Sequence, residues 1–183
     1  QVNPHFLFNA LNTLKAVIRR DSDQAAQLVQ FLSTFFRKNL KRPSEIVTLS
    51  DEIEHVNAYL QIEQARFQSR LQVSLSVPDE LAYQHLPAFP LQPIVENAIK
   101  HNSVSTEHPL HIRVTLSGGY ITVGNPKSPL LSEIKSTGLG QKNIIERYAL
   151  LCERKVKIEN GKDYYAVSLP ILKNITPHED TDS

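Results

Sequence analysis

Apolar and polar positions in the first forty residues repeat with the period of two amphipathic helices. Leu7, Leu11, Leu14 and Ile18 recur at intervals of four, three and four, which predicts a helix over residues 1 to about 19 with a narrow apolar seam. Asp21-Ser22-Asp23 is typical of a turn and a helix N-cap, so a second helix is expected to about Asn39. Its apolar side would carry Leu28, Phe31, Leu32, Phe35 and Phe36.

Two helices joined by a tight turn make a helical hairpin. Because the hairpin cannot cover its own seam, we expect it to pair with a second copy of the chain as a four-helix bundle. His5, Asn9 and Asn12 fall on the side of the first helix opposite the predicted seam, so His5 is expected to face solvent.

A third helix is predicted after a linker of moderate length. Residues 42–49 include Pro43 and form the linker, and Ser50 is expected to cap the helix, with Asp51 and Glu52 in its first turn. Its apolar stripe contains one charged residue, Glu63, for which a structural ion pair with Arg66 or Arg70 is favoured over a catalytic role. The stripe consists of Ile53, Val56, Leu60, Glu63 and Phe67.

The remaining pattern alternates strands with two more helices. Strands are predicted over residues 71–77, 110–116, 120–123, 156–159 and 164–169, with hairpin turns at Gly118-Gly119 and Asn160-Gly161. Helices are predicted over residues 91–101 and from the glycine-containing segment 136–140 to about Leu151. This order predicts an α+β fold, with a mixed, mostly antiparallel sheet and helices on one face. The expected division is a hairpin over residues 1–41, the linker 42–49, a folded domain over 50–172 and a polar, acidic, disordered tail over 173–183.

Composition narrows the class of protein without naming it. The 183 residues are 40% hydrophobic and 21% charged, which is ordinary for a globular protein, and a net charge of +1 without a basic run gives no reason to expect nucleic acid as a partner. No apolar stretch approaches the ~20 residues of a membrane-spanning helix. The single Cys152 excludes an internal disulfide and fits a reducing compartment. The absence of Met and the start at Gln1 suggest a piece excised from a longer protein.

The predicted helix over residues 91–101 separates its chemistry onto two faces. Glu96, Asn97 and Lys100 fall on one face with His101 at its margin, whereas the other face is apolar. An amide oxygen is a suitable ligand for Mg²⁺, an amine attracts phosphate, and an acid can orient a nucleophile. These residues are therefore candidates for a magnesium-bound phosphate site. The alternative is the polar face of an ordinary amphipathic helix.

Two further elements could belong to such a site. Thr137-Gly138-Leu139-Gly140 precedes a helix, and glycines with free amides at a helix start favour an anion, although most Gly-x-Gly pairs are only turns. His5 is the other element, because an exposed neutral imidazole can attack a γ-phosphoryl group. Taken alone, His5 fits an incidental surface histidine better.

Three segments together resemble a known family. Residues 1–12 (QVNPHFLFNALN) resemble the phosphoacceptor motif of LytS-type sensor histidine kinases, and residues 91–101 (LQPIVENAIKH) resemble their N box. Residues 137–144 (TGLGQKNI) with Glu146-Arg147 are similar to their glycine box and the helix that follows. The first two motifs are highly specific and the third moderately so. The three occur in the family's order, and the likeness covers about residues 1–170.

This resemblance implies a two-component signalling enzyme that uses ATP and Mg²⁺. His5 would take the γ-phosphoryl group and pass it to an aspartate of a response regulator, Asn97 would hold Mg²⁺, and Glu96 would act as base or orienter. Lys100 and His101 would lie near the phosphates. Thr137, Gly138, Leu139 and Gly140 would end the lid over the triphosphate. The implied fold is a helical hairpin for dimerisation and phosphotransfer, followed from about residue 50 by the GHKL-type ATP-binding sandwich. The resemblance further implies a homodimer and a cytoplasmic position in a parent anchored in the bacterial inner membrane.

Some positions depart from the family pattern. The related kinases usually carry Asp followed by Gly where Asn125 stands, and that Asp binds the adenine amino group, so Asn125 would accept this hydrogen bond without a charge. Gln141 stands where Leu is common, and Ser136 where Gly is common. Phe6 occupies the place where many other histidine kinases have an acid, as the LytS-type pattern has it, so the proton of His5 would leave by Glu96 or water. Asn9, one turn after His5, could position a water.

Two other functions stay open from the sequence. A degenerate GHKL pseudokinase or dimeric scaffold with weak nucleotide binding is favoured slightly by Asn125 and Gln141, while intact His5 and Asn97 favour the kinase. A GHKL ATPase that hydrolyses ATP to water would keep Glu96 without needing the His5 motif.

Overall fold

The computed structural model describes residues 3–40, 45–128 and 139–172. The chain begins with two helices, α1 (Pro4–Ile18) and α2 (Ser22–Leu40), followed by the short strand β1 (Ile46–Thr48) and the long helix α3 (Leu49–Phe67). Strands β2 (Leu71–Ser76) and β3 (His85–Pro87) lead to helix α4 (Leu91–His101). The remaining elements are β4 (Leu110–Ser117), β5 (Tyr120–Pro126), α5 (Leu139–Leu151), β6 (Lys157–Asn160) and β7 (Tyr164–Pro170).

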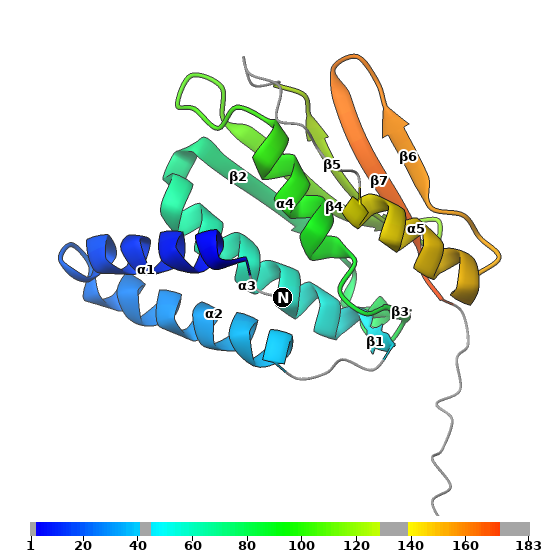
Figure 1. Cartoon of the computed structure of the whole chain (residues 1–183), viewed down its shortest axis with the longest axis horizontal. Coiled ribbons are helices and arrows are strands. Elements are labelled where there is room, and N and C mark those ends of the chain that lie inside the picture. Colours follow the sequence, from blue (N-terminus) through cyan, green and yellow to red (C-terminus); the bar gives the residue numbers. More distant parts are fainter. Residues whose placement is uncertain (1–2, 41–44, 129–138, 173–183) are drawn as a thin grey trace, which may run out of the picture.

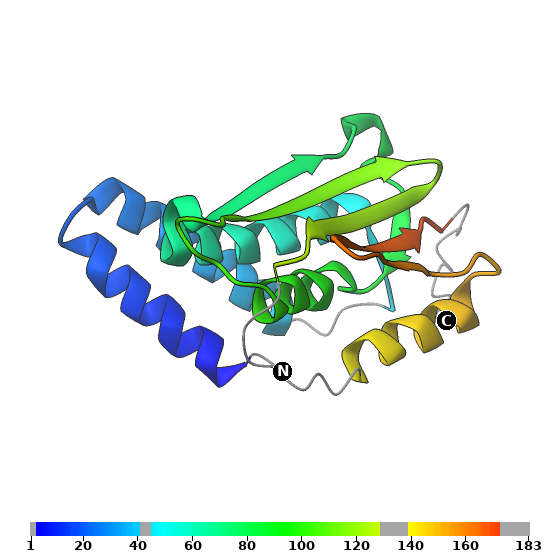
Figure 2. The ribbon, with the colours of Figure 1, turned by 90° about the horizontal axis from the view of Figure 1, so that it is seen from above.

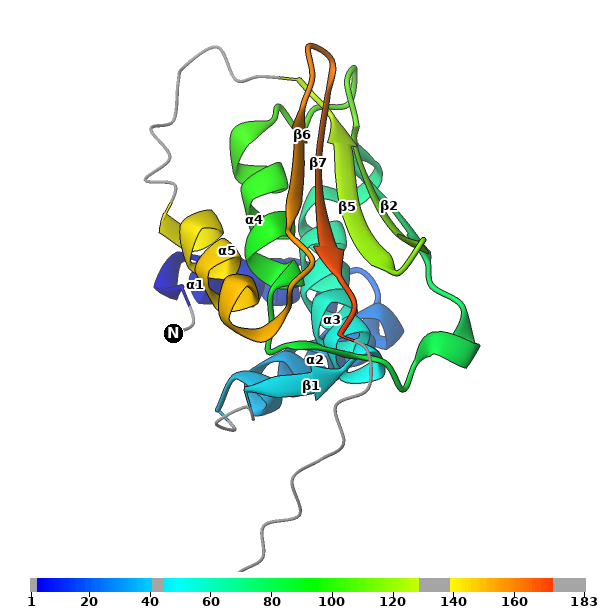
Figure 3. The ribbon, with the colours of Figure 1, turned by 90° about the vertical axis from the view of Figure 1, so that its right-hand side faces the viewer.

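Five strands form one twisted sheet in the order β2-β4-β5-β7-β6. Only β2 and β4 are parallel, with Leu71 opposite Leu110, and the other neighbours are antiparallel. Helices α3, α4 and α5 lie on one face of this sheet (Figures 1 and 3). The predicted α+β fold with a mixed, mostly antiparallel sheet and helices on one face is confirmed.

The α1–α2 hairpin packs on the side of α3 that faces away from the sheet, so α3 is sandwiched between two layers (Figures 1 and 2). This position explains why α3 is buried around most of its circumference instead of along one stripe. Nine of its residues are buried: Leu49, Glu52, His55, Val56, Ala58, Tyr59, Leu60, Ile62 and Glu63. The hairpin and the sheet therefore share one apolar core.

The predicted seam of α1 is wrong by one position. Phe6, Ala10 and Val17 are buried, whereas Leu11 and Ile18 are 49% and 57% exposed. Residues 6, 10 and 17 also follow a helical repeat, so the sequence of α1 contains two adjacent apolar stripes. The stripe that carries Phe6 is the buried one, because α1 packs against α3 as well as α2. On α2 the prediction is confirmed, with Leu28, Leu32 and Phe35 buried.

The start of α3 also differs from the prediction. Thr48, and not Ser50, is the N-cap: its hydroxyl accepts from the Asp51 amide at 3.1 Å and contacts Asp51 Oδ2 at 2.8 Å. Strand β1 occupies residues 46–48 of the predicted linker, because Ile46–Thr48 pair with β3. The division into hairpin, linker and domain stays a prediction, and the predicted tail over 173–183 lies outside the described residues.

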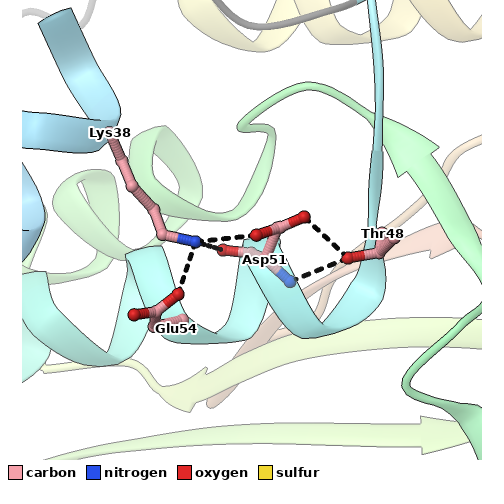
Figure 4. Close-up of polar contacts among 4 residues, drawn as sticks. All are labelled: Lys38, Thr48, Asp51 and Glu54. Atoms are coloured by element: carbon pink, nitrogen blue, oxygen red, sulfur yellow. Dashed lines mark hydrogen bonds and ion pairs between the residues drawn. The ribbon is translucent and has the colours of Figure 1, made fainter. Parts of the chain in front are cut away.

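A charged cluster fixes the end of α2 to the start of α3 (Figure 4). Lys38 Nζ lies 2.9 Å from Asp51 Oδ1 and 2.6 Å from Glu54 Oε2, and it also donates to the Asp51 carbonyl at 3.2 Å. The Lys38 side chain is only 14% exposed, so this contact is screened less than a surface ion pair. The predicted partner of Glu63 is present as well, with Arg66 Nη1 at 3.4 Å from Glu63 Oε2.

A buried carboxyl group on α3 holds the beginning of α4. Pro90, the N-cap residue of α4, offers no side-chain cap. Glu52 Oε1 instead accepts from the Leu91 amide at 2.8 Å and also from the Phe89 backbone. The sequence predicted Glu52 only as a first-turn acid of α3, yet its side chain is fully buried. Burial raises the pKa of Glu52 to about 8, so the neutral acid predominates at pH 7.

The loop before α4 is held from both sides. Phe89 has a positive φ of 52°, a conformation that non-glycine residues keep only where their surroundings enforce it. His55 lies 4.4 Å from the Phe89 ring between centroids, and its Nε2 contacts Gln92 Oε1 at 2.8 Å. From α5, Arg147 Nη1 donates to the Ala88 carbonyl at 2.7 Å. Helices α3 and α5 thus fix the position of α4.

The described part of the chain has no helix that is both long and apolar enough to cross a membrane.

Gly124 on β5, the central strand of the sheet, tests the packing against Tyr164 of the neighbouring strand β7. A Cβ at this position would collide with the hydroxyl and the ring of Tyr164 on β7, so Gly124→Ala should destabilise the fold by about 1–3 kcal/mol. Urea unfolding measures the change. Adding Tyr164→Ala should recover part of the loss, because the obstructing ring is gone. Gly140→Ala is the matched control: no atom lies within 4 Å of its Cβ position on α5, so stability should rise by up to about 1 kcal/mol.

Ionisation of Glu52 should make stability depend on pH. Its pKa rises from the ordinary 4.5 to about 8 in the folded chain, so between these values the folded state binds one more proton than the unfolded state. The stabilising contribution is complete below about pH 4.5 and is lost as the pH rises through 8. The free energy of unfolding should therefore fall more steeply in the wild type than in Glu52→Gln between about pH 5 and 8, by up to about 1.4 kcal/mol per pH unit. Urea unfolding at several pH values measures this free energy, and an equal pH dependence in the wild type and Glu52→Gln would contradict the prediction.

Candidate functional site

Helix α4 carries the polar face that the sequence predicted, within the predicted bounds. Leu91, Ile94, Val95 and Ala98 are buried towards the core. Glu96 and Asn97 are half-buried, and Lys100 is exposed. The four apolar side chains anchor the helix, so its polar residues are held on a rigid element at the edge of the core.

His101 lies at the end of the same helix and is half-buried. Burial lowers the pKa of His101, and the neighbouring Lys100 lowers it further, which favours the neutral imidazole at pH 7. Its Nε2 is buried and lacks a hydrogen-bond partner among the described residues. A neutral ring with one unoccupied nitrogen can donate to or accept from a polar ligand group.

The start of α1 lies beside this polar face, although the two segments are about ninety residues apart in the sequence (Figure 2). Asn3 Nδ2 is 3.5 Å from Glu96 Oε1, and Asn3 Oδ1 caps α1 by accepting from the His5 amide at 3.0 Å. One side chain therefore contacts both the backbone of His5 and the carboxyl group of Glu96. The sequence did not identify Asn3, although Asn before a proline is a common N-cap signal.

His5 is exposed, as predicted, and contacts one neighbour on its own helix. The Asn9 amide nitrogen lies 3.2 Å from His5 Nδ1 and 3.5 Å from His5 Nε2. The next residue, Phe6, is buried and stacks on Tyr59 of α3 at 5.1 Å between ring centroids. His5 thus faces solvent, while the residue next to it, Phe6, is fixed in the core.

Asn125 lies near the end of β5 and is 2% exposed. Its Nδ2 donates to the Pro126 carbonyl at 2.8 Å, so the amide has a defined orientation. Asn125 is opposite Tyr165 of β7 in the sheet register.

Asn102, which the sequence did not identify, joins α4 to the end of β5. Its Nδ2 donates to the Ala98 carbonyl and its Oδ1 accepts from the Ser128 amide, both at 2.8 Å. The Ser103 amide also donates to the Ser128 carbonyl at 2.6 Å. The polar helix and the strand that carries Asn125 are therefore connected where the chain continues towards residues 129–138.

The glycine-containing segment is described only in part. Thr137 and Gly138 and the side chain of Leu139 lie outside the described residues, and Gly140 is exposed in the first turn of α5. Gln141, one of the departures from the family pattern, has a structural partner: its Nε2 donates to the Tyr165 hydroxyl at 2.9 Å. This contact attaches the start of α5 to β7.

Among the described residues, no three His, Cys, Asp or Glu side chains gather into a metal-binding group. Magnesium in nucleotide sites is held by one or two protein oxygens together with phosphates and water, so such a group is not required for it. The Asn97 amide oxygen on the polar face of α4 is chemically suited to this role.

Comparison with known proteins identifies the family. A family model described as histidine kinase matches residues 1–71. The chain is 82% identical over 103 residues, 56% of its length, to the sensor histidine kinase BtsS of Escherichia coli K12, and 36% identical over 194 aligned positions, 93% of its length, to the sensor protein LytS of Enterococcus faecalis. It spans 18% and 33% of the lengths of these two proteins.

Among solved structures, the histidine kinase AdeS of Acinetobacter baumannii is similar at 13% identity with a TM-score of 0.45, covering 92% of this chain and 96% of that one. This likeness is too distant to add to the argument. The sequence relatives are decisive, because LytS matches nearly the whole chain and the acceptor and N-box motifs are both present. The chain belongs to the LytS-type sensor histidine kinases.

Proposed function

We propose that the chain is the cytoplasmic catalytic part of a sensor kinase that phosphorylates His5 with ATP and Mg²⁺ and passes the phosphoryl group to an aspartate of a response regulator. The observation that carries this proposal is the meeting of the two motifs: the acceptor helix begins beside the polar face of α4, with Asn3 in contact with Glu96. An acceptor imidazole and a candidate phosphate site in one place are what phosphoryl transfer requires.

The reaction would form a bond between an imidazole nitrogen of His5 and the γ-phosphorus while the bond to the β–γ bridging oxygen breaks. ADP leaves with that electron pair, and the ring proton passes to Glu96 or water. ATP-bound Mg²⁺ would neutralise charge on the phosphates, with Asn97 as its protein ligand. Lys100 and His101 would contact the phosphates, as would Thr137, Gly138, Leu139 and Gly140.

Asn125 would receive the adenine. Its Nδ2 donates to the Pro126 carbonyl, so its Oδ1 is the atom that would accept a hydrogen bond from the adenine amino group. This arrangement supports nucleotide binding without the aspartate that is usual in related kinases. Gln141, which stands where Leu is common in the family, likewise has a structural role, because its side chain contacts Tyr165.

Asn9 would position His5. The Asn9 amide nitrogen lies 3.2 Å from His5 Nδ1 and in this orientation donates to it. A flip of the amide would turn its oxygen to the ring, where it would accept from Nδ1–H. That hydrogen bond would fix the tautomer whose Nε2 lone pair is free to attack phosphorus. In other histidine kinases an acid next to the histidine can serve this purpose, and here that place is filled by the buried Phe6.

The partners follow from the same proposal. Apolar side chains remain exposed on the hairpin and would pair with a second copy as a homodimer; they are Phe8, Leu11, Ile18 and Val29. The response regulator would approach His5 on its solvent side. The parent protein would be anchored in the bacterial inner membrane upstream of residue 1, and nucleic acid is not proposed as a partner.

Incubation with γ-labelled ATP and Mg²⁺ tests the proposed function. The wild type should take up acid-labile, alkali-stable label, because phosphohistidine has that stability. His5→Gln should lose the label completely while retaining nucleotide binding by calorimetry, and Asn97→Asp should lose label because the metal ligand is altered. Absence of both label and ATP binding in the wild type would contradict the kinase and favour the scaffold. Release of phosphate with no label on His5 would favour the ATPase.

Asn9 gives a second test of the acceptor. Asn9→Ala should lower the rate of labelling about 10- to 100-fold, as expected when a general acid–base or orienting group is lost, without changing nucleotide affinity. Asn9→Asp should retain more activity than Asn9→Ala, because a carboxylate also accepts from Nδ1–H. Equal rates in the wild type and Asn9→Ala would contradict the orienting role. Asn12→Ala, one turn further along the exposed side of α1, is the matched control and should have little effect.

A further inference from the structure

We propose that phosphorylation occurs within one chain, with Phe6 as the positioning residue that holds His5 at the α4 face of its own subunit. This inference rests on the proposed function and states which copy of His5 is the substrate. The step itself is the transfer described above: a histidine nitrogen bonds to the γ-phosphorus, ADP departs with the bridging oxygen, and the ring proton leaves to Glu96 or water.

Phe6 anchors the acceptor helix to the catalytic half of the same chain. Its side chain is 7% exposed, and its ring lies 5.0 Å from Phe35 of α2 and 5.1 Å from Tyr59 of α3, stacked at 26° on Tyr59. Aromatic contacts of this kind are worth more than their buried area alone. Because Phe6 immediately follows His5, its burial limits how far the imidazole can move from α3.

Asn3 makes the second link between the acceptor and α4. It accepts from the His5 amide and donates to the Glu96 carboxyl group, so it bridges the two motifs in one chain. The Glu96 carboxyl group thus lies against the start of the helix that carries His5, and in the structure both belong to one chain.

The hairpin as a whole is also fixed to its own α3. Phe35 stacks on His55 at 5.3 Å and 9°, and Lys38 forms the ion pairs with Asp51 and Glu54. Tyr59, which receives Phe6, is 4% exposed. If His5 moved from its own α4 towards that of a second chain, Phe6 would leave this cluster and expose Tyr59. Transfer within the chain needs no such rearrangement.

Heterodimers distinguish the two routes. Chains with different tags and sizes are co-expressed and purified through both tags, one carrying His5→Gln and the other Asn97→Asp. Transfer within a chain predicts no label on either chain, because neither has both His5 and Asn97. Label on the Asn97→Asp chain, at about half the wild-type rate, would overturn the inference.

A heterodimer of the wild type with Asn97→Asp supplies the internal control. The wild-type chain alone should be labelled. Label on the Asn97→Asp chain, with or without label on the wild-type chain, overturns the inference and leaves the proposed function intact, whereas absence of label on both chains overturns both. If the chain is monomeric by light scattering and forms no heterodimer, a labelling rate per chain that does not change with protein concentration supports transfer within the chain, and a rate that rises with concentration contradicts it.

A substitution at Phe6 tests its positioning role. Phe6→Leu keeps an apolar side chain but removes the stacked ring, and should lower the maximal labelling rate about 10- to 100-fold with an unchanged apparent affinity for ATP. Phosphorylation of His5 by phosphoramidate, a small donor that does not need α4, should keep its wild-type rate. If the labelling rate of Phe6→Leu falls equally with both donors, or does not fall with ATP, Phe6 has no positioning role.

Val17→Ala is the matched control for Phe6→Leu. Val17 is also buried on α1 but lies eleven residues further along the helix, about 16 Å away. Its truncation should reduce stability while leaving the labelling rate within about twofold of the wild type. A loss of rate as large as that of Phe6→Leu would show that loosening the hairpin, and not the position of Phe6, controls the reaction.

Discussion

The packing of Phe6 and Phe35 against α3 determines how the helical hairpin and the sheet domain lie relative to each other. The hairpin and the sheet domain each have an apolar surface, and α3 lies between them and is buried by both. Phe6 and Phe35 enter the same cluster with Tyr59 and His55. As a result, the helix that carries His5 begins beside the polar face of α4 and is fixed there.

A second buried contact gives α4 its fixed position. Glu52 supplies the cap that Pro90 cannot, and His55 packs on Phe89 while it contacts Gln92. His55 thus belongs both to the aromatic cluster of the hairpin and to the loop that precedes α4. Any movement of the hairpin on α3 would disturb the contacts that hold α4, so the hairpin and the polar face of α4 are coupled through packed side chains.

The sequence predicted local elements well because their periodicity is strong. The bounds of α4, the strand order along the chain and the separation of Glu96 and Asn97 from the apolar face all follow from residue spacing. It failed where tertiary contacts choose between equivalent local patterns. The two apolar stripes on α1 are equally periodic, and only α3 selects Phe6 over Leu11. Glu52 looked like an exposed first-turn acid, since nothing local indicates that α4 would cover it.

The most direct test of the account is a cross-link between the acceptor helix and α4. Cysteines at Asn3 and Glu96, in a Cys152→Ala background, are joined by a short bifunctional maleimide, and the product is separated by size under denaturing conditions. We expect the main product to have the mass of one chain plus a single linker by intact mass spectrometry, with both thiols consumed, because Asn3 contacts Glu96 of its own subunit. A product with the mass of two chains as the main species would contradict it.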